Sequence, residues 1–387
     1  ELVGTLSCNH RGRGARAQVM TNPYAASGVD TEAGDKAVEL MKQAVSATHN
    51  NLVLGGFGGF AGMIDASILK SYDHPILATS TDGVGTKVAI AQAMDKHDTI
   101  GQDLVGMVVD DIVVTGARSL FMTDYIACGQ LEPARIADIV RGIAKACRAV
   151  DVALVGGETA EHPGLLKPHE YDVAGAAVGV VEKDKILSSE KVQVGDVVLG
   201  LQSSGLHSNG YSLVRKIVAD NNWQYTDLIA EFGRTLGEEL LEPTALYTGV
   251  LNKLLQDVRY QNKFSTMSHI TGGGIAANLS RVLPAHVSLD VQRSTWQPQP
   301  VFQVLAESAG IELFDLESTW NLGLGFAIVV REDSASAIMG ILRELGVPSW
   351  QLGVIEPKPE NAEAKGYLSS AKGTHGGSVR LVGEYAK

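Results

Sequence analysis

The amino-acid sequence predicts an α+β protein built from two domains. Its 387 residues are too many for one ordinary hydrophobic core. Strand-like and helix-like stretches alternate along the chain, but not in the strict strand–helix–strand order of a doubly wound sheet. A charged stretch without apolar periodicity, residues 182–196, separates the two halves. We therefore expect an N-terminal domain at 20–185 and a C-terminal domain at 186–357.

The first half opens with a predicted helix at 34–48, where apolar residues from Ala37 to Val45 recur at helical spacing. Another helix is expected at 133–149, because Pro133 suits the first turn of a helix. The other elements expected in this half are strands at 51–54 and 75–81, a helix at 98–115, and strands at 120–126, 153–155 and 173–181.

The second half repeats this alternation and ends in a polar, glycine-rich stretch. The elements expected there are a strand at 197–201, helices from 211 and at 245–255, a helix opened by 271–274, strands at 311–316 and 324–330, and a helix at 334–345. Residues 358–387 are expected to form a loosely held polar tail. At the other end, residues 1–19 are rich in Arg and Gly and contain little that could pack. We interpret them as an added leader, with Met20 as a natural start.

The composition is that of an acidic globular protein. A formal net charge of −12 argues against nucleic-acid or membrane-surface partners, which need a basic face. The three cysteines show no C-x-x-C spacing and so predict neither a zinc site nor a redox site. Such low cysteine usage suits a reducing cytosol, and no apolar run reaches the length of a membrane span. We expect a cytoplasmic protein.

A glycine cluster at 55–59 is the first candidate binding element. Glycines let backbone N–H groups approach an anion closely, although the same residues also form tight turns. The spacing Gly56-x-Gly58-x-x-Ala61 also fits the fingerprint of a dinucleotide fold, with Asp82 as the ribose-binding acid. A dehydrogenase is therefore an alternative. The cluster residues proposed to bind the cofactor are Gly55, Gly56, Gly58 and Gly59.

Asp82 opens a second glycine-rich turn, which favours a different role for it. The turn reads DGVGTK at 82–87 and brings a hydroxyl and a cation next to the carboxylate. A ribose-binding acid does not need these groups, whereas a carboxylate that holds Mg²⁺ beside a phosphate loop does. The chain lacks the G-x-x-x-x-G-K-[ST] loop, so any use of ATP must occur outside the common P-loop fold.

Several acids follow that could bind a metal. Asp110 and Asp111 lie in a strongly apolar stretch, where carboxylates are costly unless they are paired or bound to a metal. Adjacent helical residues diverge by about 100°, so only one of the two is expected to face a given ion. Asp103 belongs to the same stretch, and all three are equally compatible with a solvated helix face. Glu158 follows a buried-looking strand and two glycines, as a metal ligand or as a cap.

Two loops of the second half are candidate anion sites at helix N-termini, where orphan N–H groups and the helix dipole favour negative charge. Plain capping would explain their Ser and Asn residues equally well. Helix capping does not require a histidine, and we therefore select His207 as a candidate functional residue. The residues expected to bind substrate are Ser208, Asn209 and Gly210 in the first loop, and Thr271, Gly272, Gly273 and Gly274 in the second.

Together these motifs resemble the aminoimidazole ribonucleotide synthetase family, also called phosphoribosylformylglycinamidine cyclo-ligases. The resemblance covers about residues 28–354, and eight strings in order make it specific. They are SGVDTEAG at 27–34, GGFGGF at 55–60, TDGVGTK at 81–87, HDTIGQDLVGM at 97–107, GGETAEHPG at 156–164, YDVAG at 171–175, SSGLHSNGYSLVRK at 203–216 and HITGGG at 269–274. The wider superfamily includes other ATP-using enzymes, and one of these with another acceptor is the main alternative.

The resemblance implies ATP-dependent closure of formylglycinamidine ribonucleotide to aminoimidazole ribonucleotide. It implies that ATP is bound by the 55–59 loop and by Asp82, Gly83, Thr86 and Lys87. It implies Mg²⁺ on Asp82, Asp111 and Glu158, and catalytic roles for His207, Lys42 and Asp111. The implied fold is an N-terminal sheet that forms a barrel across a homodimer, beside a sandwich-like C-terminal α+β domain. Two positions depart from the family pattern, because Asp110 stands where many relatives have Asn and His162 where Met is usual.

Overall fold

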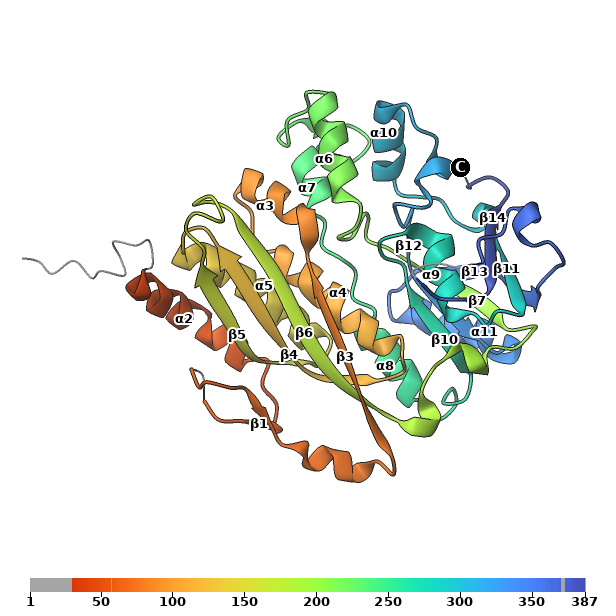
Figure 1. The fold of residues 1–387 in the computed structure, drawn as a ribbon, viewed down its shortest axis with the longest axis horizontal. Coiled ribbons are helices and arrows are strands. Elements are labelled where there is room, and N and C mark those ends of the chain that lie inside the picture. The colour runs from red at the N-terminus through yellow and green to blue at the C-terminus, as the bar shows by residue number, and fades with distance from the viewer. Residues whose placement is uncertain (1–29, 57, 370–372, 387) are drawn as a thin grey trace, which may run out of the picture.

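A computed structural model describes residues 30–56, 58–369 and 373–386. The predicted leader at 1–19 lies outside these residues. The described chain forms two main sheets, one of four strands and one of six, with two small two-stranded sheets beside them (Figure 1). The four-stranded sheet ends with strand β6 and the six-stranded sheet begins with β7. The change from one sheet to the other therefore falls inside the charged stretch predicted as the boundary.

The N-terminal domain is a sheet with the strand order β3-β6-β4-β5. Strands β4 and β5 run parallel, and the other pairs are antiparallel. Its elements are α2 (Thr31–Ser46), β1 (Val53–Leu54), β2 (Met63–Ile64), β3 (Pro75–Gly83), α3 (Val88–Met94), α4 (Ile100–Val113), β4 (Arg118–Cys128), α5 (Pro133–Ala149), β5 (Ala153–Glu161) and β6 (Tyr171–Glu182).

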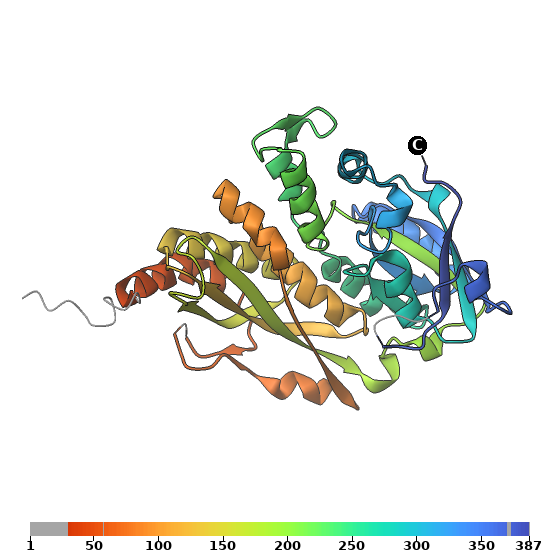
Figure 2. The ribbon, with the colours of Figure 1, turned by 45° about the horizontal axis from the view of Figure 1, so that its top comes forward.

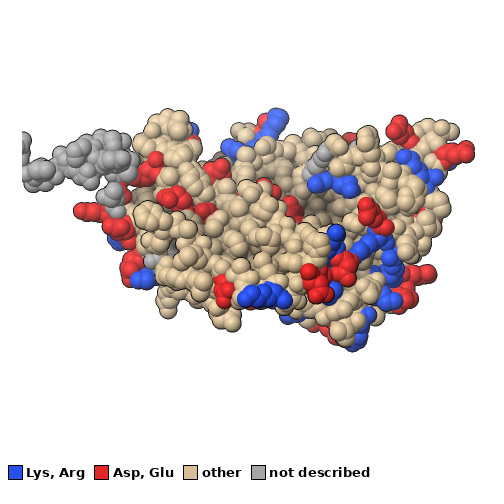
Figure 3. All heavy atoms as spheres, turned by 60° about the horizontal axis from the view of Figure 1, so that its bottom comes forward, with Lys and Arg blue, Asp and Glu red and all other residues tan. Residues whose placement is uncertain are grey.

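Helices α4 and α5 cover one face of this sheet, and α2 packs against α5 (Figures 1 and 2). Helix α4 is apolar almost all round because it also packs against α8 of the second domain. The opposite face of the sheet is open and carries large exposed side chains, including Leu77, 59% exposed, and Tyr125, 40% exposed. Charged residues are sparse over much of this side of the molecule (Figure 3).

The C-terminal domain has the strand order β10-β12-β7-β13-β11-β14, with only β11 and β14 parallel. The interior strand β12 is buried along its whole length, because helices lie on the sheet. The elements are β7 (Val197–Gln202), α6 (Tyr211–Asp220), β8 (Leu228–Ile229), β9 (Arg234–Thr235), α7 (Leu236–Leu240), α8 (Thr248–Gln256), β10 (Phe264–His269), α9 (Gly274–Val282), β11 (Val287–Gln292), α10 (Pro300–Ala309), β12 (Leu324–Val330), α11 (Glu332–Glu344), β13 (Ser349–Pro357) and β14 (Ser378–Val382).

Two sequence predictions are wrong in this half. The strand expected at 311–316 is instead a 3-10 helix over Leu313–Leu316. The expected loose tail contains β14, which pairs with β11 in the main sheet. Arg380 on β14 donates to both carboxylate oxygens of Asp290 at 2.8 Å, and the hydroxyl of Tyr367 donates to the same carboxylate at 2.6 Å. This polar segment is therefore held by paired side chains as well as by strand pairing.

Both domains are α+β, as predicted. Within the described residues neither main sheet closes into a barrel. No helix in the described part of the chain has the length and apolar character needed to cross a membrane.

Candidate functional site

The predicted site residues fall into two regions of the structure. The first is a pocket beside the glycine cluster, which we call the glycine-loop pocket. The second is the contact zone between the two domains, which we call the domain seam and which contains the 82–87 turn, His207 and the acids of α4. The predicted substrate loops lie at one end of this seam.

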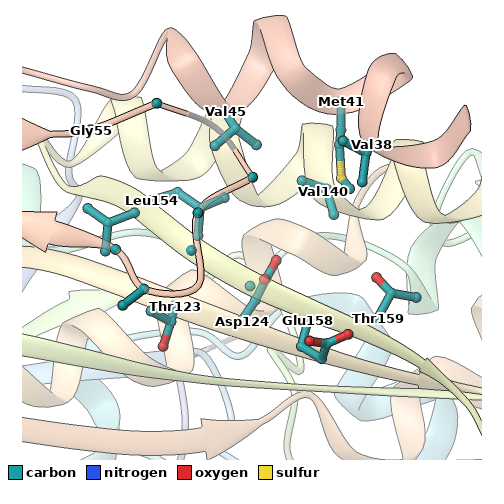
Figure 4. A pocket seen from close by; sticks show the side chains of 18 of the residues that line it. Val38, Met41, Val45, Gly55, Thr123, Asp124, Val140, Leu154, Glu158 and Thr159 are labelled. Carbon is teal, nitrogen blue, oxygen red and sulfur yellow. The ribbon is translucent and has the colours of Figure 1, made fainter. Parts of the chain in front are cut away.

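The glycine-loop pocket has a volume of about 640 Å³ and is bounded by α2, α5, β4, β5 and the loop between β1 and β2 (Figure 4). Gly55 and Gly58 have φ of 85° and 92°, a backbone conformation that favours glycine. Gly62 packs so closely on β5 that a Cβ atom there would lie 2.5 Å from the Val155 carbonyl oxygen. Five predicted site residues line the pocket: Gly55, Gly56, Gly58, Gly59 and Glu158.

The walls of this pocket are largely apolar. Ala37, Val38 and Met41 contribute from α2, and Leu154 and Val155 contribute from β5. Lys42, predicted to act in catalysis, is exposed on α2 and is absent from the lining.

The glycine loop does not have the setting of a dinucleotide fingerprint. That fingerprint needs a strand, a glycine turn and then a helix whose N-terminus meets the pyrophosphate. Here the loop joins β1 to β2, which pair as a short antiparallel hairpin. The alternative of a nicotinamide-dependent dehydrogenase therefore has no structural support at this loop.

Lys87 lies in the domain seam and is completely buried. Its Nζ donates to Asp103 Oδ1 at 2.8 Å, to the His207 carbonyl at 3.1 Å and to the Glu242 carbonyl at 2.6 Å. These contacts use all three of its N–H donors. The prediction that Lys87 binds ATP is thus not supported in this conformation, because the ammonium group joins the two domains instead.

Asp103 is the buried partner of Lys87. Its Oδ1 also accepts from the backbone N–H of Thr244 at 2.9 Å and from the Thr244 hydroxyl at 2.7 Å. Burial raises the pKa of Asp103 and lowers that of Lys87, while the opposite charge of each partner counteracts these changes. The Lys87–Asp103 pair is thus an architectural link between α4 and the second domain.

The adjacent acids of α4 have different surroundings. Asp110 is buried, and its Oδ1 accepts from the Thr248 N–H at 2.8 Å and the Thr248 hydroxyl at 2.7 Å. It also accepts from the N–H of Tyr247 at 3.2 Å, so it caps the start of α8 from another domain. Asp111 is 45% exposed and accepts from His269. Only Asp111 is therefore open to a ligand.

His269 contacts the predicted site residue Asp111, and we did not select it from the sequence. Its Nδ1 lies 2.9 Å from Asp111 Oδ1, and its buried Nε2 has no hydrogen-bond partner. Burial lowers the pKa of His269, but the hydrogen bond and charge of Asp111, with the charges of Asp110 and Asp82, outweigh it and hold this pKa above its usual value. The signal was its position in HITGGG, at the end of the buried strand β10.

His207 has a structural role in this conformation. It has φ of 60°, is buried, and its Nε2 accepts from the backbone N–H of Ser204 at 3.1 Å and of Ala245 at 3.4 Å. Burial, with the charges of His269 and Lys87, lowers the pKa of His207 well below its usual value. A neutral, buried imidazole that accepts two amide protons is not placed to move protons for a substrate. The predicted catalytic role is thus not supported here.

The two predicted substrate loops meet. A Cβ atom on Gly272 would lie 3.5 Å from Asn209 Oδ1. Ser208 Oγ lies 3.3 Å from Thr244 Oγ1. Gly274 has φ of 74° and no room for a side chain, since a Cβ there would lie 1.7 Å from the Glu317 carbonyl oxygen.

The same end of the seam also holds the other predicted residues. Thr86 Oγ1 lies 3.3 Å from Ser212 Oγ on α6, so the 82–87 turn borders the first substrate loop. Gly83 donates its backbone N–H to Asp82 Oδ1 at 2.7 Å. Asn278 donates to the carbonyls of Thr271 and Gly274, which holds the second loop in shape. The 82–87 turn, the 271–274 turn and the acids Asp82 and Asp111 therefore surround one region between the domains.

The predicted metal ligands are not brought together by a single chain. The charges of Asp82 and Asp111 both raise the pKa of His269. Glu158 instead lies on β5, which two intervening strands separate from β3, the strand of Asp82. Three strand spacings correspond to roughly 14 Å. Within the described residues no group of three or more His, Cys, Asp or Glu could hold a metal ion. The assignment of Mg²⁺ to Asp82, Asp111 and Glu158 together therefore stays a prediction, which the geometry of one chain does not support.

Comparisons with known proteins identify relatives over most of the chain. Residues 63–181 match the family described as AIR synthase related protein, N-terminal domain, and residues 193–364 match its C-terminal domain. A phosphoribosylformylglycinamidine cyclo-ligase of Bacillus mycoides is 46% identical over 337 residues, 86% of this chain and 95% of that protein. Another of the same name from Alkaliphilus oremlandii is 44% identical over 333 residues, 86% of this chain and 96% of that protein.

Solved structures share the fold at low sequence identity. The hydrogenase maturation protein HypE of E. coli has a TM-score of 0.61 at 15% identity, covering 92% of this chain and 95% of that one. Thiamine-monophosphate kinase of Stenotrophomonas maltophilia has a TM-score of 0.58 at 17% identity, covering 90% and 97%. A HypE structure in complex with ATP has a TM-score of 0.59 at 17% identity, covering 92% and 93%.

Proposed function

The chain belongs to the phosphoribosylformylglycinamidine cyclo-ligase family, and from this we infer that it is an ATP-dependent ligase of purine biosynthesis. It closes formylglycinamidine ribonucleotide to aminoimidazole ribonucleotide and releases ADP and phosphate. The observation that carries this inference is the identity of about 46% to a cyclo-ligase along 86% of the chain, through both domains.

The reaction has to make a poor electrophile reactive. A formamide carbonyl carbon resists attack, and its oxygen is a poor leaving group. Transfer of the γ-phosphoryl group of ATP to that oxygen removes both obstacles. The amidine-side nitrogen then attacks the same carbon, the ring closes and phosphate leaves. Phosphoryl transfer of this kind depends mainly on positioning and on neutralising charge.

The domain seam offers groups for this positioning. Asp82 and Asp111 are oxygen ligands of the kind Mg²⁺ prefers, and protein sites for Mg²⁺ often supply only one or two carboxylates beside nucleotide phosphates. Bound there, Mg²⁺ would supply positive charge to the transferring phosphoryl group. His269 orients Asp111 through its hydrogen bond, a contact that fixes one carboxylate oxygen. We propose these three residues as the centre of the phosphoryl-transfer site.

The ribonucleotide phosphate has a suitable place in the two substrate loops. The turn at Thr271, Gly272, Gly273 and Gly274 precedes α9, whose dipole favours an anion at this end, while the N–H groups of Gly274 and Ile275 donate to the Thr271 and Glu317 carbonyls. Ser208 and Asn209 border the same turn and add polar side chains. The amidine of a substrate anchored there would lie on the side of the seam that carries Asp82.

The two groups of predicted ATP residues point to a homodimer. The glycine loop packs on β5, and the 82–87 turn follows β3, so they lie at opposite edges of one sheet. A second copy of the chain, placed against the open sheet face with Leu77 and Tyr125, would bring one loop toward the other copy's turn. Sedimentation velocity at micromolar chain concentration should then show a dimer, and a fully active monomer would contradict the proposal.

A cytoplasmic location is consistent with the cysteines. Cys128 and Cys147 are both free and buried, as suits a reducing compartment.

The reaction is tested by following ADP release from Mg²⁺-ATP with and without formylglycinamidine ribonucleotide. We expect ADP only when this substrate is present, together with one aminoimidazole product per ADP. Binding of ATP without turnover would instead indicate an ATP-using relative with another acceptor.

A further inference from the structure

The glycine-loop pocket contains one buried carboxylate that the reaction described above does not use. Asp124 lies on β4 and lines the pocket together with the glycine loop. In the register of the sheet it forms a row with Asp82, Gly175 and Gly157, on the face that the helices cover. Its side chain rises from the strand toward the space under α2 and α5 (Figure 4). The row therefore directs Asp124 into the pocket.

Asp124 is half-buried as a residue, but one of its carboxyl oxygens is fully buried and unpaired. Its Oδ2 has no hydrogen-bond partner in the structure. A Cβ atom on Gly157 would lie 1.7 Å from Asp124 Oδ1, so the neighbouring strand can carry no side chain at that point. A buried polar atom without a partner is destabilising by about 1–3 kcal/mol. A ligand that donates a hydrogen bond to Asp124 would remove this penalty.

The protonation of Asp124 fits a ligand with both a donor and an acceptor. Burial raises the pKa of Asp124 to about 7, and the contact that opposes this is its own backbone N–H. The thiol of Cys147, whose own pKa the Asp124 charge helps to raise, lies close by. Near neutral pH the side chain is therefore often the uncharged acid, which offers one O–H donor and one acceptor.

The walls around Asp124 suit a flat apolar ring. Met41 and Val38 lie on the α2 side, and Leu154 and Val155 lie on the β5 side. A pocket of about 640 Å³ is within the range for a ligand of nucleoside size. Pockets of this type combine apolar walls with a few polar groups that fix orientation. A purine base between α2 and β5 would meet Asp124 with its polar edge.

We propose that the glycine-loop pocket takes the adenine ring of ATP and that Asp124 selects it by its amino edge. The exocyclic amino group donates to the carboxyl oxygen, and the carboxyl O–H donates to the adjacent ring nitrogen. This proposal rests on the proposed use of ATP. Asp124 thereby becomes a determinant of nucleotide specificity, separate from the phosphoryl-transfer residues of the domain seam.

The test compares ATP with purine riboside 5′-triphosphate, which has the same ring and phosphates but lacks the amino group. Calorimetric titration of the full chain with Mg²⁺, without ribonucleotide substrate, gives both affinities. We expect the wild type to bind ATP about ten-fold more tightly, as one buried hydrogen bond implies. Asp124→Leu should bind both nucleotides equally, and both more weakly than the wild type, because the O–H bond to the ring nitrogen is lost with either nucleotide. Asp124→Asn keeps a donor and an acceptor, and should retain the preference.

The outcomes separate the base site from the reaction. Equal affinities in the wild type, or an undiminished preference for ATP in Asp124→Leu, would overturn the role of Asp124 while leaving ATP use intact. Failure of the wild type to bind either nucleotide would overturn both. If Asp124→Leu does not fold, the Asn variant decides: a lost preference in a folded Asp124→Asn protein contradicts the paired donor and acceptor.

Discussion

The glycine-loop pocket and the domain seam both contain buried acids, but these acids differ in what surrounds them. In the seam, Asp103 Oδ1 accepts from Lys87 of its own domain and from Thr244 of the second domain, and Asp110 Oδ1 accepts three hydrogen bonds from Tyr247 and Thr248. Asp103 Oδ2 and Asp124 Oδ2 both lack a partner, but only Asp124 lines the glycine-loop pocket. A buried carboxylate anchored by close hydrogen bonds between elements is part of the architecture. One left unsatisfied beside a cavity indicates a ligand.

The largest effect should come from breaking the buried pair of the seam. Lys87→Met leaves the Asp103 charge buried without its cation, and such losses are destabilising by about 3–5 kcal/mol. Urea unfolding should show this loss, and the double variant Lys87→Met/Asp103→Leu should recover much of it. A Lys87→Met protein of normal stability that no longer binds ATP would restore the role predicted from the sequence.

The adjacent acids Asp110 and Asp111 sharpen the comparison within one helix. We expect Asp111→Asn to lower kcat by about 100-fold or more, because a charge at the proposed phosphoryl-transfer site is lost. Asp110→Asn should change little, because an amide oxygen can accept the same hydrogen bonds. Asp110→Ala should be destabilising by about 1–3 kcal/mol, because the α8 start loses its cap. Steady-state kinetics and urea unfolding check these expectations, and equal losses of kcat in the two Asn variants would contradict them.

A smaller effect should appear in the pH dependence of stability. The pKa of Asp124 is about 7 in the folded chain and 3.8 without the fold, so the folded state binds more protons between these values. The contribution of Asp124 to the free energy of unfolding therefore falls as the pH rises toward and through 7. Between pH 6 and 8 the wild type should lose about 1.4 kcal/mol relative to Asp124→Asn. If the difference in unfolding free energy between the two proteins is the same at both pH values, Asp124 does not titrate in this range.

Local patterns predicted many elements. The helix α5 matches its predicted range, because Pro133 starts it and Ala149 ends its amphipathic pattern. The apolar run at 311–316 was misread as a strand, since a short apolar run does not distinguish a strand from a turn of helix. The strands β10, β11 and β13 were missed, although two of them lie inside the six-stranded sheet.

The site was harder to predict than the fold. The motifs marked stretches that the fold gathers into two regions, but the surroundings of each side chain depend on residues far along the chain. Lys87 is satisfied by acceptors on residues 103, 207 and 242, which no local pattern reveals. Helical geometry separates the neighbours Asp110 and Asp111, so that Asp110 is buried and Asp111 is partly exposed, but the choice of Asp111 as a ligand stays a prediction. Asp124 was overlooked because it stands alone in an ordinary strand.

The C-terminal strand has a consequence for how the molecule behaves in a crowded solution. Without β14, strand β11 would expose a row of unpaired N–H and C=O groups, which other chains can extend by strand pairing. The far side of β14 is in turn bridged by Leu368, whose N–H and C=O pair with Val379. The polar end of the chain thus closes the free edge of the sheet. A chain truncated after β13 would keep its reaction centre and become prone to self-association.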